Sequence, residues 1–208
     1  MDMKKYEDKN SMGVDVLKEI GSIGTGNAAT ALSTVLGRKI EMSIPEVEVM
    51  GFNQALQKLG GPEQIVAAVL VQISGESKGI MLFMQDLKFV NIVLDSLLHK
   101  TIADYDEIDQ LEISALTEVG NILISSYMNA LSTLTGITMN LSVPSVSINM
   151  LGGIMNVPFA MYGYQTDKLM TIRGRFRCDG EEVFSRLLLL PDMESLDYIM
   201  KKLGVEIG

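Results

Sequence analysis

Apolar residues recur at helical spacing over two long segments of the chain. From Val14 to Gly37 the spacing is about 100° per residue, and Gly37 supplies a C-terminal stop. The second segment runs from about Asp109 to Thr135. The apolar faces comprise Leu17, Ile20, Gly24, Ala28, Ala31, Leu32 and Val35 in the first, and Leu116, Val119, Leu123, Tyr127, Ala130 and Leu134 in the second. We therefore expect two long amphipathic helices, the first preceded by a mobile lead-in at residues 1–11.

Shorter segments show the patterns of strands and of capped helices. Residues 38–49 alternate as a strand does, and Pro45 confines this strand to an edge or a bulge. Further strands are expected at 65–73, 79–84, 138–151, 169–178 and 183–190. A short helix or turn is expected at 53–60, a helix capped by Asp86 at 86–99, and a last helix at 191–202.

The two long segments are copies of one another. Residues 15–45 align without a gap on residues 114–144 at a constant offset of 99. The identical pairs include Leu17/Leu116, Glu19/Glu118, Gly21/Gly120, Ile23/Ile122, Gly37/Gly136 and Pro45/Pro144, together with the run Ala-Leu-Ser-Thr at 31–34 and 130–133. An ungapped match of this length indicates an internal duplication.

The duplication predicts the architecture. Each half, about 12–100 and 110–204, reads as α-β-β-β-α, and the acidic segment 100–109 joins them. We expect an α/β (α+β) fold of pseudo-twofold symmetry, in which the halves form one continuous sheet covered by the two long helices. Residues 1–208 are then a single domain, and the internal twofold favours a monomer.

Composition excludes several classes of function. A net charge of −9 argues against a general binder of nucleic acid or of anionic membranes, which requires a basic face. A single cysteine, Cys178, and a single histidine, His99, argue against disulfides and against cysteine- or histidine-based metal sites. The N-terminus has no apolar signal region, and no segment reaches the ~18 apolar residues that span a bilayer. We therefore expect a cytoplasmic protein.

The segment Gly24–Ala29 fits the dinucleotide fingerprint G-x-G-x-x-A. That fingerprint requires a preceding strand and free backbone amides at a helix N-terminus. Here nearly three turns of helical pattern precede Gly24, and the repeat copy of the segment contains no glycine. Nucleotide binding is therefore disfavoured, and the small residues are expected to let another surface approach this helix closely.

A polar stripe occupies the opposite face of each long helix. The stripes are Asp15, Glu19 and Ser22 in the first copy, and Ser114, Glu118 and Asn121 in the second. The spacing i, i+4 and i+7 keeps each set within about 60° on the helix. A solvated helix face can carry such residues, but the retention of glutamate at the same register in both copies favours a function.

The chemistry of the stripe favours hydrolysis without a protein nucleophile. A glutamate can pair with a cation, and a carboxamide can orient a water molecule through its oxygen and its amino group. In-line hydrolysis of a phosphoryl group requires this arrangement when its charge is neutralised from elsewhere.

The stripe and the following proline resemble a known signature. Ser114-x3-Glu118-x2-Asn121 with Pro144 is similar to the signature of the CheC/CheX/FliY family of bacterial chemotaxis phosphatases. Asp15-x3-Glu19-x2-Ser22 with Pro45 repeats it without the asparagine. The resemblance covers essentially the whole chain, and two copies in a chain of this length favour the CheC branch.

The resemblance implies dephosphorylation of the response regulator CheY at its phospho-aspartate. It implies that Glu118 pairs with the regulator's active-site lysine, that Asn121 positions the attacking water and that Ser114 supports the helix face. The Mg²⁺ is then the regulator's own, so the chain needs no metal or other cofactor. A serine is shorter than a carboxamide, so the site containing Ser22 is expected to be weak or inactive. The receptor deamidase CheD is the second implied partner.

A rival hypothesis is a non-catalytic adaptor that binds CheY or CheD through the paired helices. Both hypotheses use the same docking face. Beyond the motif, this face continues through the small or polar residues Ser125, Asn129 and Ser132, and through Gly26, Ala29 and Ser33 in the first copy. Small side chains there suggest that the regulator lies close to the helix.

Overall fold

The computed structural model describes residues 3–43, 45–162 and 168–204, and its two halves follow the same order of elements. The first half comprises α1 (Met3–Leu36), β1 (Ile40–Met42), β2 (Glu46–Gly51), α2 (Phe52–Lys58), β3 (Ile65–Gly75), β4 (Gly79–Gln85) and α3 (Leu87–Leu98). A 3-10 turn, η1 (Tyr105–Glu107), lies in the joint. The second half comprises α4 (Gln110–Thr135), β5 (Met139–Leu141), β6 (Ser145–Met150), α5 (Leu151–Tyr162), β7 (Lys168–Cys178), β8 (Glu181–Pro191) and α6 (Met193–Lys202).

The described residues form one eight-stranded antiparallel sheet to which both halves contribute. Its order runs from β1 and β2 through β7, β8, β4 and β3 to β5 and β6. The halves meet where β4 pairs with β8, and they also exchange their outer strands, since β1 and β2 pair with β7 while β5 and β6 pair with β3. The predicted α/β fold with a continuous sheet built from duplicated halves is confirmed.

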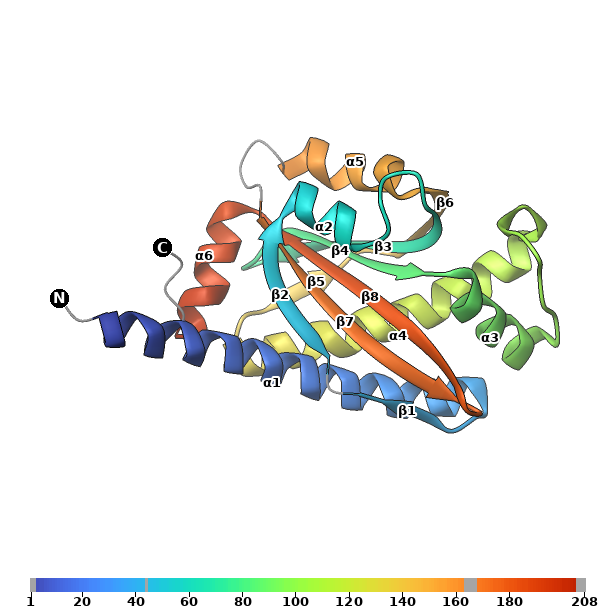
Figure 1. Ribbon diagram of the computed structural model, residues 1–208, viewed down its shortest axis with the longest axis horizontal. Coiled ribbons are helices and arrows are strands. Elements are labelled where there is room, and N and C mark those ends of the chain that lie inside the picture. The colour runs from blue at the N-terminus through green and yellow to red at the C-terminus, as the bar shows by residue number, and fades with distance from the viewer. Residues whose placement is uncertain (1–2, 44, 163–167, 205–208) are drawn as a thin grey trace.

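Helices cover both faces of the sheet (Figure 1). The long helices α1 and α4 lie together on one face, over the larger core cluster, which includes Val69, Phe83, Leu123 and Tyr127. The short helices α2 and α5 cover the other face, over a second cluster that includes Val66, Leu82 and Leu188. The central strand β4 is buried along its whole length, as expected for a strand covered on both sides.

The first helix begins earlier than the sequence pattern suggested. Residues 3–11, expected to be part of a lead-in, belong to α1. They include three lysines and contain no glycine or proline, so they are compatible with helix. A helix already nucleated by the buried segment extends by one hydrogen bond per residue without a new nucleation cost.

Two details of the packing also differ from expectation. Each of the strands expected at 38–49 and 138–151 is split in two, although β1 and β2 do lie at the sheet edge as Pro45 indicated. Leu134 and Val35 were assigned to the buried faces but are 38% and 36% exposed. These two residues occupy the same repeat position, and the buried positions that follow them are Thr135 and Leu36. Thr135 and Leu36 each lie four residues after a buried leucine, so the contact face follows that i+4 row and leaves the preceding position at its margin.

The helix α5 was not predicted. It contains Gly152, Gly153 and Pro158, which are signals of a turn, and no polar face that would reveal helical periodicity. Burial of Leu151, Ile154 and Met155 against the second cluster stabilises it nonetheless. Its repeat counterpart is α2, which the sequence predicted as a short helix or turn at 53–60.

Candidate active site on the two long helices

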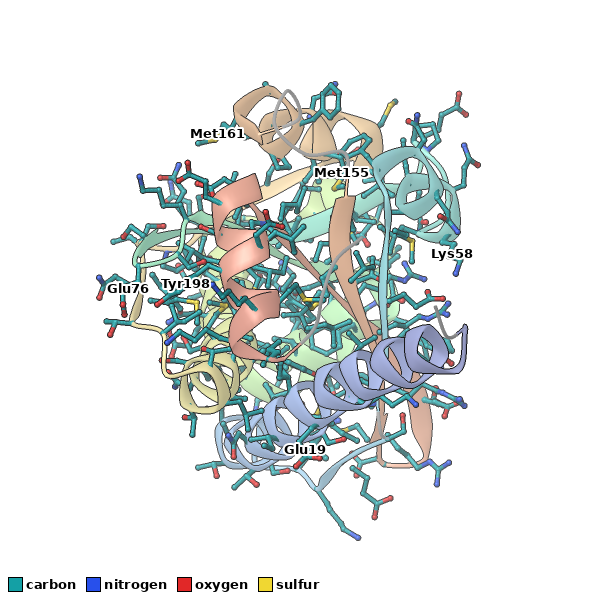
Figure 2. All side chains as sticks on the ribbon, turned by 90° about the vertical axis from the view of Figure 1, so that its left-hand side faces the viewer. Glu19, Lys58, Glu76, Met155, Met161 and Tyr198 are labelled. Carbon is teal, nitrogen blue, oxygen red and sulfur yellow. The ribbon has the colours of Figure 1, made fainter. Side chains whose placement is uncertain are left out.

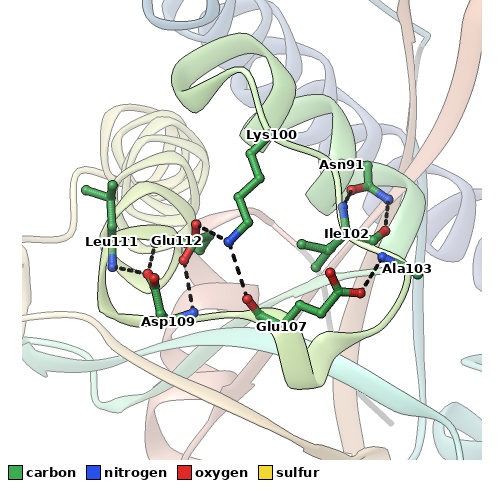
Figure 3. A network of polar contacts seen from close by, with 8 residues as sticks. All are labelled: Asn91, Lys100, Ile102, Ala103, Glu107, Asp109, Leu111 and Glu112. Atoms are coloured by element: carbon green, nitrogen blue, oxygen red, sulfur yellow. Dashed lines mark hydrogen bonds and ion pairs between the residues drawn. The ribbon is translucent and has the colours of Figure 1, made fainter.

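The N-terminus of α4 is capped immediately before the candidate motif (Figure 3). The Asp109 carboxylate accepts hydrogen bonds from the backbone N–H groups of Leu111 and Glu112. In return, the Glu112 side chain accepts from the backbone N–H of Asp109 at 2.9 Å. This reciprocal capping box satisfies backbone donors that the first helical turn leaves without partners. It sets the position at which α4 begins, four residues before Ser114.

An ion pair between the half-exposed Lys100 and the buried Glu112 fixes the same turn to the joint between the halves. The Lys100 Nζ lies 2.7 Å from the Glu112 carboxylate, whose side chain is only 3% exposed. Lys100 also donates to the backbone carbonyl of Glu107, and the Asn91 side chain exchanges two hydrogen bonds with the backbone of Ile102 (Figure 3). Hydrogen bonds with Asp109, followed by that with Lys100, hold the pKa of Glu112 well below its usual range. The carboxylate therefore stays ionised and anchors the start of α4.

Close contacts with the sheet fix α4 at the motif itself. Gly120 lies so near β3 that a Cβ added to it would fall 2.4 Å from Val69 Cγ2. One turn earlier, the buried Gln85 side chain donates to the backbone carbonyl of Leu116 at 3.2 Å. The backbone on both sides of Glu118 is thus held by β3 and by the end of β4.

The motif side chains of α4 lie on its outer face. Ser114 and Glu118 are exposed, and Asn121 and Ser125 are half-buried. The Ser114 hydroxyl donates to the carbonyl of Gln110 at 2.8 Å. Within the described part of the chain, neither the Glu118 carboxylate nor the Asn121 carboxamide has a hydrogen-bond partner. Both groups are therefore available to a molecule that docks on this face.

The first copy of the motif lies on α1 with the same register. Glu19 is exposed, as Figure 2 shows, and Ser22 is half-buried. Asp15 belongs to the same helix, but its side chain lies outside the described part of the structure. Gly21 rests against the buried Pro45, whose Cγ would be 2.7 Å from a Cβ at that position.

The prolines that follow the two motifs are not equivalent in the structure. Pro45 is buried against Gly21, but Pro144 is half-buried and is not among the nearest neighbours of Gly120, which packs on β3 instead. Pro45 thus helps to seat the first motif helix on the sheet, and Val69 does so for the second.

The two motif helices also pack directly against one another. Gly24 of α1 faces the ring of Tyr127 on α4, and a Cβ there would be 2.5 Å from that ring. The hydroxyls of Thr25 and Tyr127 are 2.7 Å apart and hydrogen-bonded, and burial raises the pKa of Tyr127 to about 12. Gly24 is one of the small residues expected to let another surface approach the helix, and it serves a contact between α1 and α4 instead. Gly26 faces open space.

Sequence reasoning missed several residues that position the site. The pattern Asp109-x-x-Glu112 is a readable capping-box signal, but nothing in the sequence indicates that Lys100 reaches Glu112. The pairing of Thr25 with Tyr127 joins residues far apart in the chain, and a single sequence carries no signal for it.

Comparison with known proteins gives matches across the duplicated segments and beyond them. A family model described as the CheC-like family matches residues 12–49 and 111–148, which contain the two motif copies. The chain is 28% identical over 198 residues to the CheY-P phosphatase CheC of Bacillus subtilis (strain 168), covering 93% of this chain and 95% of that protein. It is 27% identical to the flagellar motor switch phosphatase FliY of the same organism, covering 71% of this chain but 38% of FliY.

Solved structures share the fold. The structure of Thermotoga maritima FliY superposes with a TM-score of 0.69 at 24% identity, covering 91% of this chain and 96% of that chain. A chemotaxis protein CheX from Desulfovibrio desulfuricans superposes with a TM-score of 0.53 at 18% identity, covering 84% and 99%. No helix in the described ranges is long and apolar enough to cross a membrane. The two motif-bearing segments thus match the CheC-like family, and the near full-length similarity to CheC and the shared fold agree with that match.

Proposed function

We propose that this chain hydrolyses the phospho-aspartate of the chemotaxis response regulator CheY at the outer face of α4. The observation that carries the proposal is the pair Glu118 and Asn121, side by side on a helix anchored at both its cap and its motif and without partners among the described residues. The name of the B. subtilis relative, a CheY-P phosphatase, supports the choice of substrate.

Glu118 acts in docking. Its exposed carboxylate pairs with the lysine of the regulator's active site. An exposed ion pair contributes only about 0.2–1 kcal/mol. Its main effect is therefore to orient the regulator so that the phosphorylated aspartate faces Asn121, and this effect weakens as salt screens the charges.

Asn121 acts on the water. Its carboxamide oxygen accepts a hydrogen bond from the attacking water, and its amino group donates one to the water oxygen. Together they place the water in line with the scissile bond. The water oxygen then bonds to phosphorus as the bond from phosphorus to the aspartyl oxygen breaks. Inorganic phosphate and a free aspartate carboxylate result.

The regulator supplies the metal in this scheme. The chemistry requires a cation on the phosphoryl oxygens, and we propose that the regulator's own Mg²⁺ meets this need. Among the described residues of this chain, no three or more histidine, cysteine, aspartate or glutamate side chains gather where they could hold a metal ion. In this scheme the chain contributes position and the regulator contributes charge neutralisation.

The first site, on α1, binds the regulator but hydrolyses its phospho-aspartate slowly. Glu19 is exposed as Glu118 is, so α1 can present the same docking charge, together with Asp15 at the preceding motif position. Ser22 offers one hydroxyl in place of a carboxamide and ends closer to the helix axis. It cannot hold a water at the distance that Asn121 reaches, so this site contributes little to the rate.

A second candidate is an adaptor function, with CheD as the partner. The observation that favours it is a set of exposed apolar side chains on α5, Val157, Phe159 and Met161, which are 51%, 43% and 44% exposed. They lie on the face of the sheet opposite to α4, and Figure 2 shows Met161 at the periphery. Val157 and Met161 are one helical turn apart and share a side of α5, so a partner that binds there would not compete with the regulator.

Dephosphorylation and binding measured in parallel separate the two functions. Wild-type protein should accelerate the loss of phosphate from CheY, and Glu118→Ala should weaken docking, more so as the salt concentration rises. Val157→Glu should abolish binding of CheD and leave the rate unchanged. If the regulator binds but its dephosphorylation is not accelerated, the phosphatase proposal is wrong. Binding of CheD that Val157→Glu abolishes would then establish the adaptor function.

A further inference from the structure

The sheet face that α2 and α5 cover has an uncovered end. Leu169 of β7 and Leu188 of β8 lie in the second cluster beneath these helices, and both strands continue past it toward β1 (Figure 1). Side chains alternate between the faces along a strand, and cross-strand partners share a face. The residues on the uncovered end are therefore Arg173, Arg175 and Arg177 of β7, with Glu182, Phe184 and Arg186 of β8.

Four of the five arginines in the chain lie on this surface, and we term Arg173, Arg175, Arg177, Phe184 and Arg186 the arginine face. The chain as a whole carries a net charge of −9, so a concentration of cations sets this surface apart. All three arginines of β7 are exposed. Phe184 lies opposite Arg175, in the middle of the arginine face, and is 41% exposed.

The equivalent strand of the first half carries no arginine. β2 and β6 are repeat copies, and their pairing places Val69 of β3 at the position of Ile172 of β7. Counted from this pair, the three arginines of β7 correspond to Leu70, Gln72 and Ser74. The duplicated fold therefore does not require arginines at these positions.

Two of the arginines directly oppose one another. Arg173 and Arg186 are cross-strand partners, and like charges in this position destabilise a sheet. Arg173 forms an ion pair with Glu46 of β2. Arg186 has no hydrogen bond or ion pair within the described part of the chain. A bound anion would relieve this repulsion.

Arg177 is the other unpaired cation, at the far end of the arginine face. Its cross-strand neighbours are Glu41 and Glu182, but each carboxylate has another partner. Glu41 pairs with Lys39 at 2.6 Å, and Glu182 lies 3.9 Å from Arg175. Among the described residues Arg177 makes no ion pair, and it lines an open hollow of about 200 Å³ between β1 and β7. Its guanidinium donors are therefore available to a ligand.

The spacing of the two unpaired arginines fits an extended peptide. Arg186 is level with Arg173, so it lies four residues from Arg177 along the sheet and one strand across. At about 3.3 Å per residue and about 4.8 Å between strands, the two positions are about 14 Å apart, with Phe184 between them. Residues i and i+4 of an extended chain are about 13 Å apart, and their side chains share a face with that of residue i+2.

We propose that the arginine face binds an extended acidic segment of a partner protein, with the pattern acidic-x-apolar-x-acidic. The two carboxylates pair with Arg177 and Arg186, and the apolar side chain packs on Phe184. Glu41, Glu46 and Glu182 are interleaved with the arginines, so they repel a continuous polyphosphate such as nucleic acid but leave room for separate carboxylates. The surface lies on the face of the sheet opposite to α4, and the proposal does not depend on the phosphatase function.

Fluorescence anisotropy with a labelled peptide of core Glu-Thr-Leu-Thr-Glu tests the proposal on the full chain. The peptide should bind with a dissociation constant below about 1 mM. A peptide of core Lys-Thr-Leu-Thr-Lys reverses the charges, and one of core Glu-Leu-Thr-Thr-Glu turns the leucine to the other side of the extended chain. Neither should bind measurably, because one loses both ion pairs and the other loses the contact with Phe184.

Substitutions on the arginine face identify the bound surface. Arg177→Gln and Arg186→Gln should each raise the dissociation constant about twofold to fivefold, and together about tenfold. Phe184→Thr keeps a strand-forming residue and should raise it at least about twofold. Lys201→Gln removes an exposed cation from α6 and should leave it unchanged. Thermal unfolding near that of wild type would show that each variant is folded.

Charge reversal gives the decisive comparison. A chain with both Arg177→Glu and Arg186→Glu should lose the glutamate peptide and bind the lysine peptide instead. Failure of the wild-type chain to bind the glutamate peptide up to about 1 mM would overturn the proposal. So would equal binding of the three peptides, or an unchanged dissociation constant in the variant with both arginines replaced by glutamine. Displacement of the peptide by single-stranded oligothymidylate would overturn it in favour of a nucleic-acid surface.

Discussion

Gly120→Ala is the substitution whose effect the structure defines most sharply. The added Cβ would lie 2.4 Å from Val69 Cγ2 and 2.7 Å from Val69 Cβ, in the middle of the sheet where Val69 is completely buried. Carbon atoms pack at about 3.5–4.0 Å. The contact is therefore short by about 1 Å, and because β3 is paired on both sides, α4 must move away from the sheet.

Two opposing terms set the effect on stability. Overpacking of this kind costs about 1–3 kcal/mol. Replacing a glycine by alanine within a helix returns about 1 kcal/mol. The expected loss in the free energy of unfolding is therefore about 0–2 kcal/mol, which leaves the protein folded.

The effect on the rate is larger, because Asn121 moves with the helix. A misplacement of about 1 Å can cost on the order of 10²-fold in rate when positioning supplies the catalysis. Urea unfolding and a dephosphorylation assay with phosphorylated CheY should therefore give a modest loss of stability and at least about a tenfold loss of rate.

The duplication provides the matched control. A Cβ at Gly21 would lie 2.7 Å from Pro45 Cγ and 3.0 Å from Val47 Cγ2, a similar clash at the first site. Gly21→Ala should lose similar stability but keep the rate, since that site lacks the carboxamide. A wild-type rate for Gly120→Ala, or equal losses of rate in both variants, would refute the reasoning.

Three other outcomes follow from the same account. Ser22→Asn in an Asn121→Ala background should restore a measurable dephosphorylation rate; a folded double variant that binds the regulator at the first site yet stays inactive would contradict this. Ser125→Arg should block binding of the phosphorylated regulator in titration calorimetry while the free energy of unfolding stays within about 0.5 kcal/mol of wild type; unchanged affinity would show that the docking face is misplaced. Contacts led by that with Asp109 lower the pKa of Glu112 from 4.5 to about 2, so its contribution to stability is complete above pH 4.5 and is lost as the pH falls toward 2. Urea unfolding should show that Glu112→Gln is less stable at neutral pH and loses less on acidification, whereas parallel pH curves would contradict this assignment.

The duplication is the reason that the fold could be predicted from one sequence. Two copies in register imply a pseudo-twofold arrangement, and buried strands such as β4 read as unbroken apolar runs. The misses have physical causes. Burial stabilises α5 despite Gly152 and Pro158, and Leu134 lies at the margin of the contact face at the end of α4.

For the site, helical spacing alone predicted that Glu118 and Asn121 share an outward face, and the structure places them there. The supports of the site depend on contacts between residues distant in the chain, such as Lys100 with Glu112 and Gly120 with Val69. Helical periodicity shows which side chains face the core but not which atoms they meet, so these contacts required the three-dimensional structure.

The most direct test of the central claim is the single-turnover dephosphorylation of phosphorylated CheY by wild-type protein and by Asn121→Ala. The side chain lies on the outer face of α4 without partners in the described residues, so its removal should leave thermal unfolding unchanged. Loss of a group that positions the water should reduce the rate on the order of 10²-fold. A variant that folds normally, binds the regulator and keeps more than about half of the wild-type rate would contradict the assignment of this face as the active site.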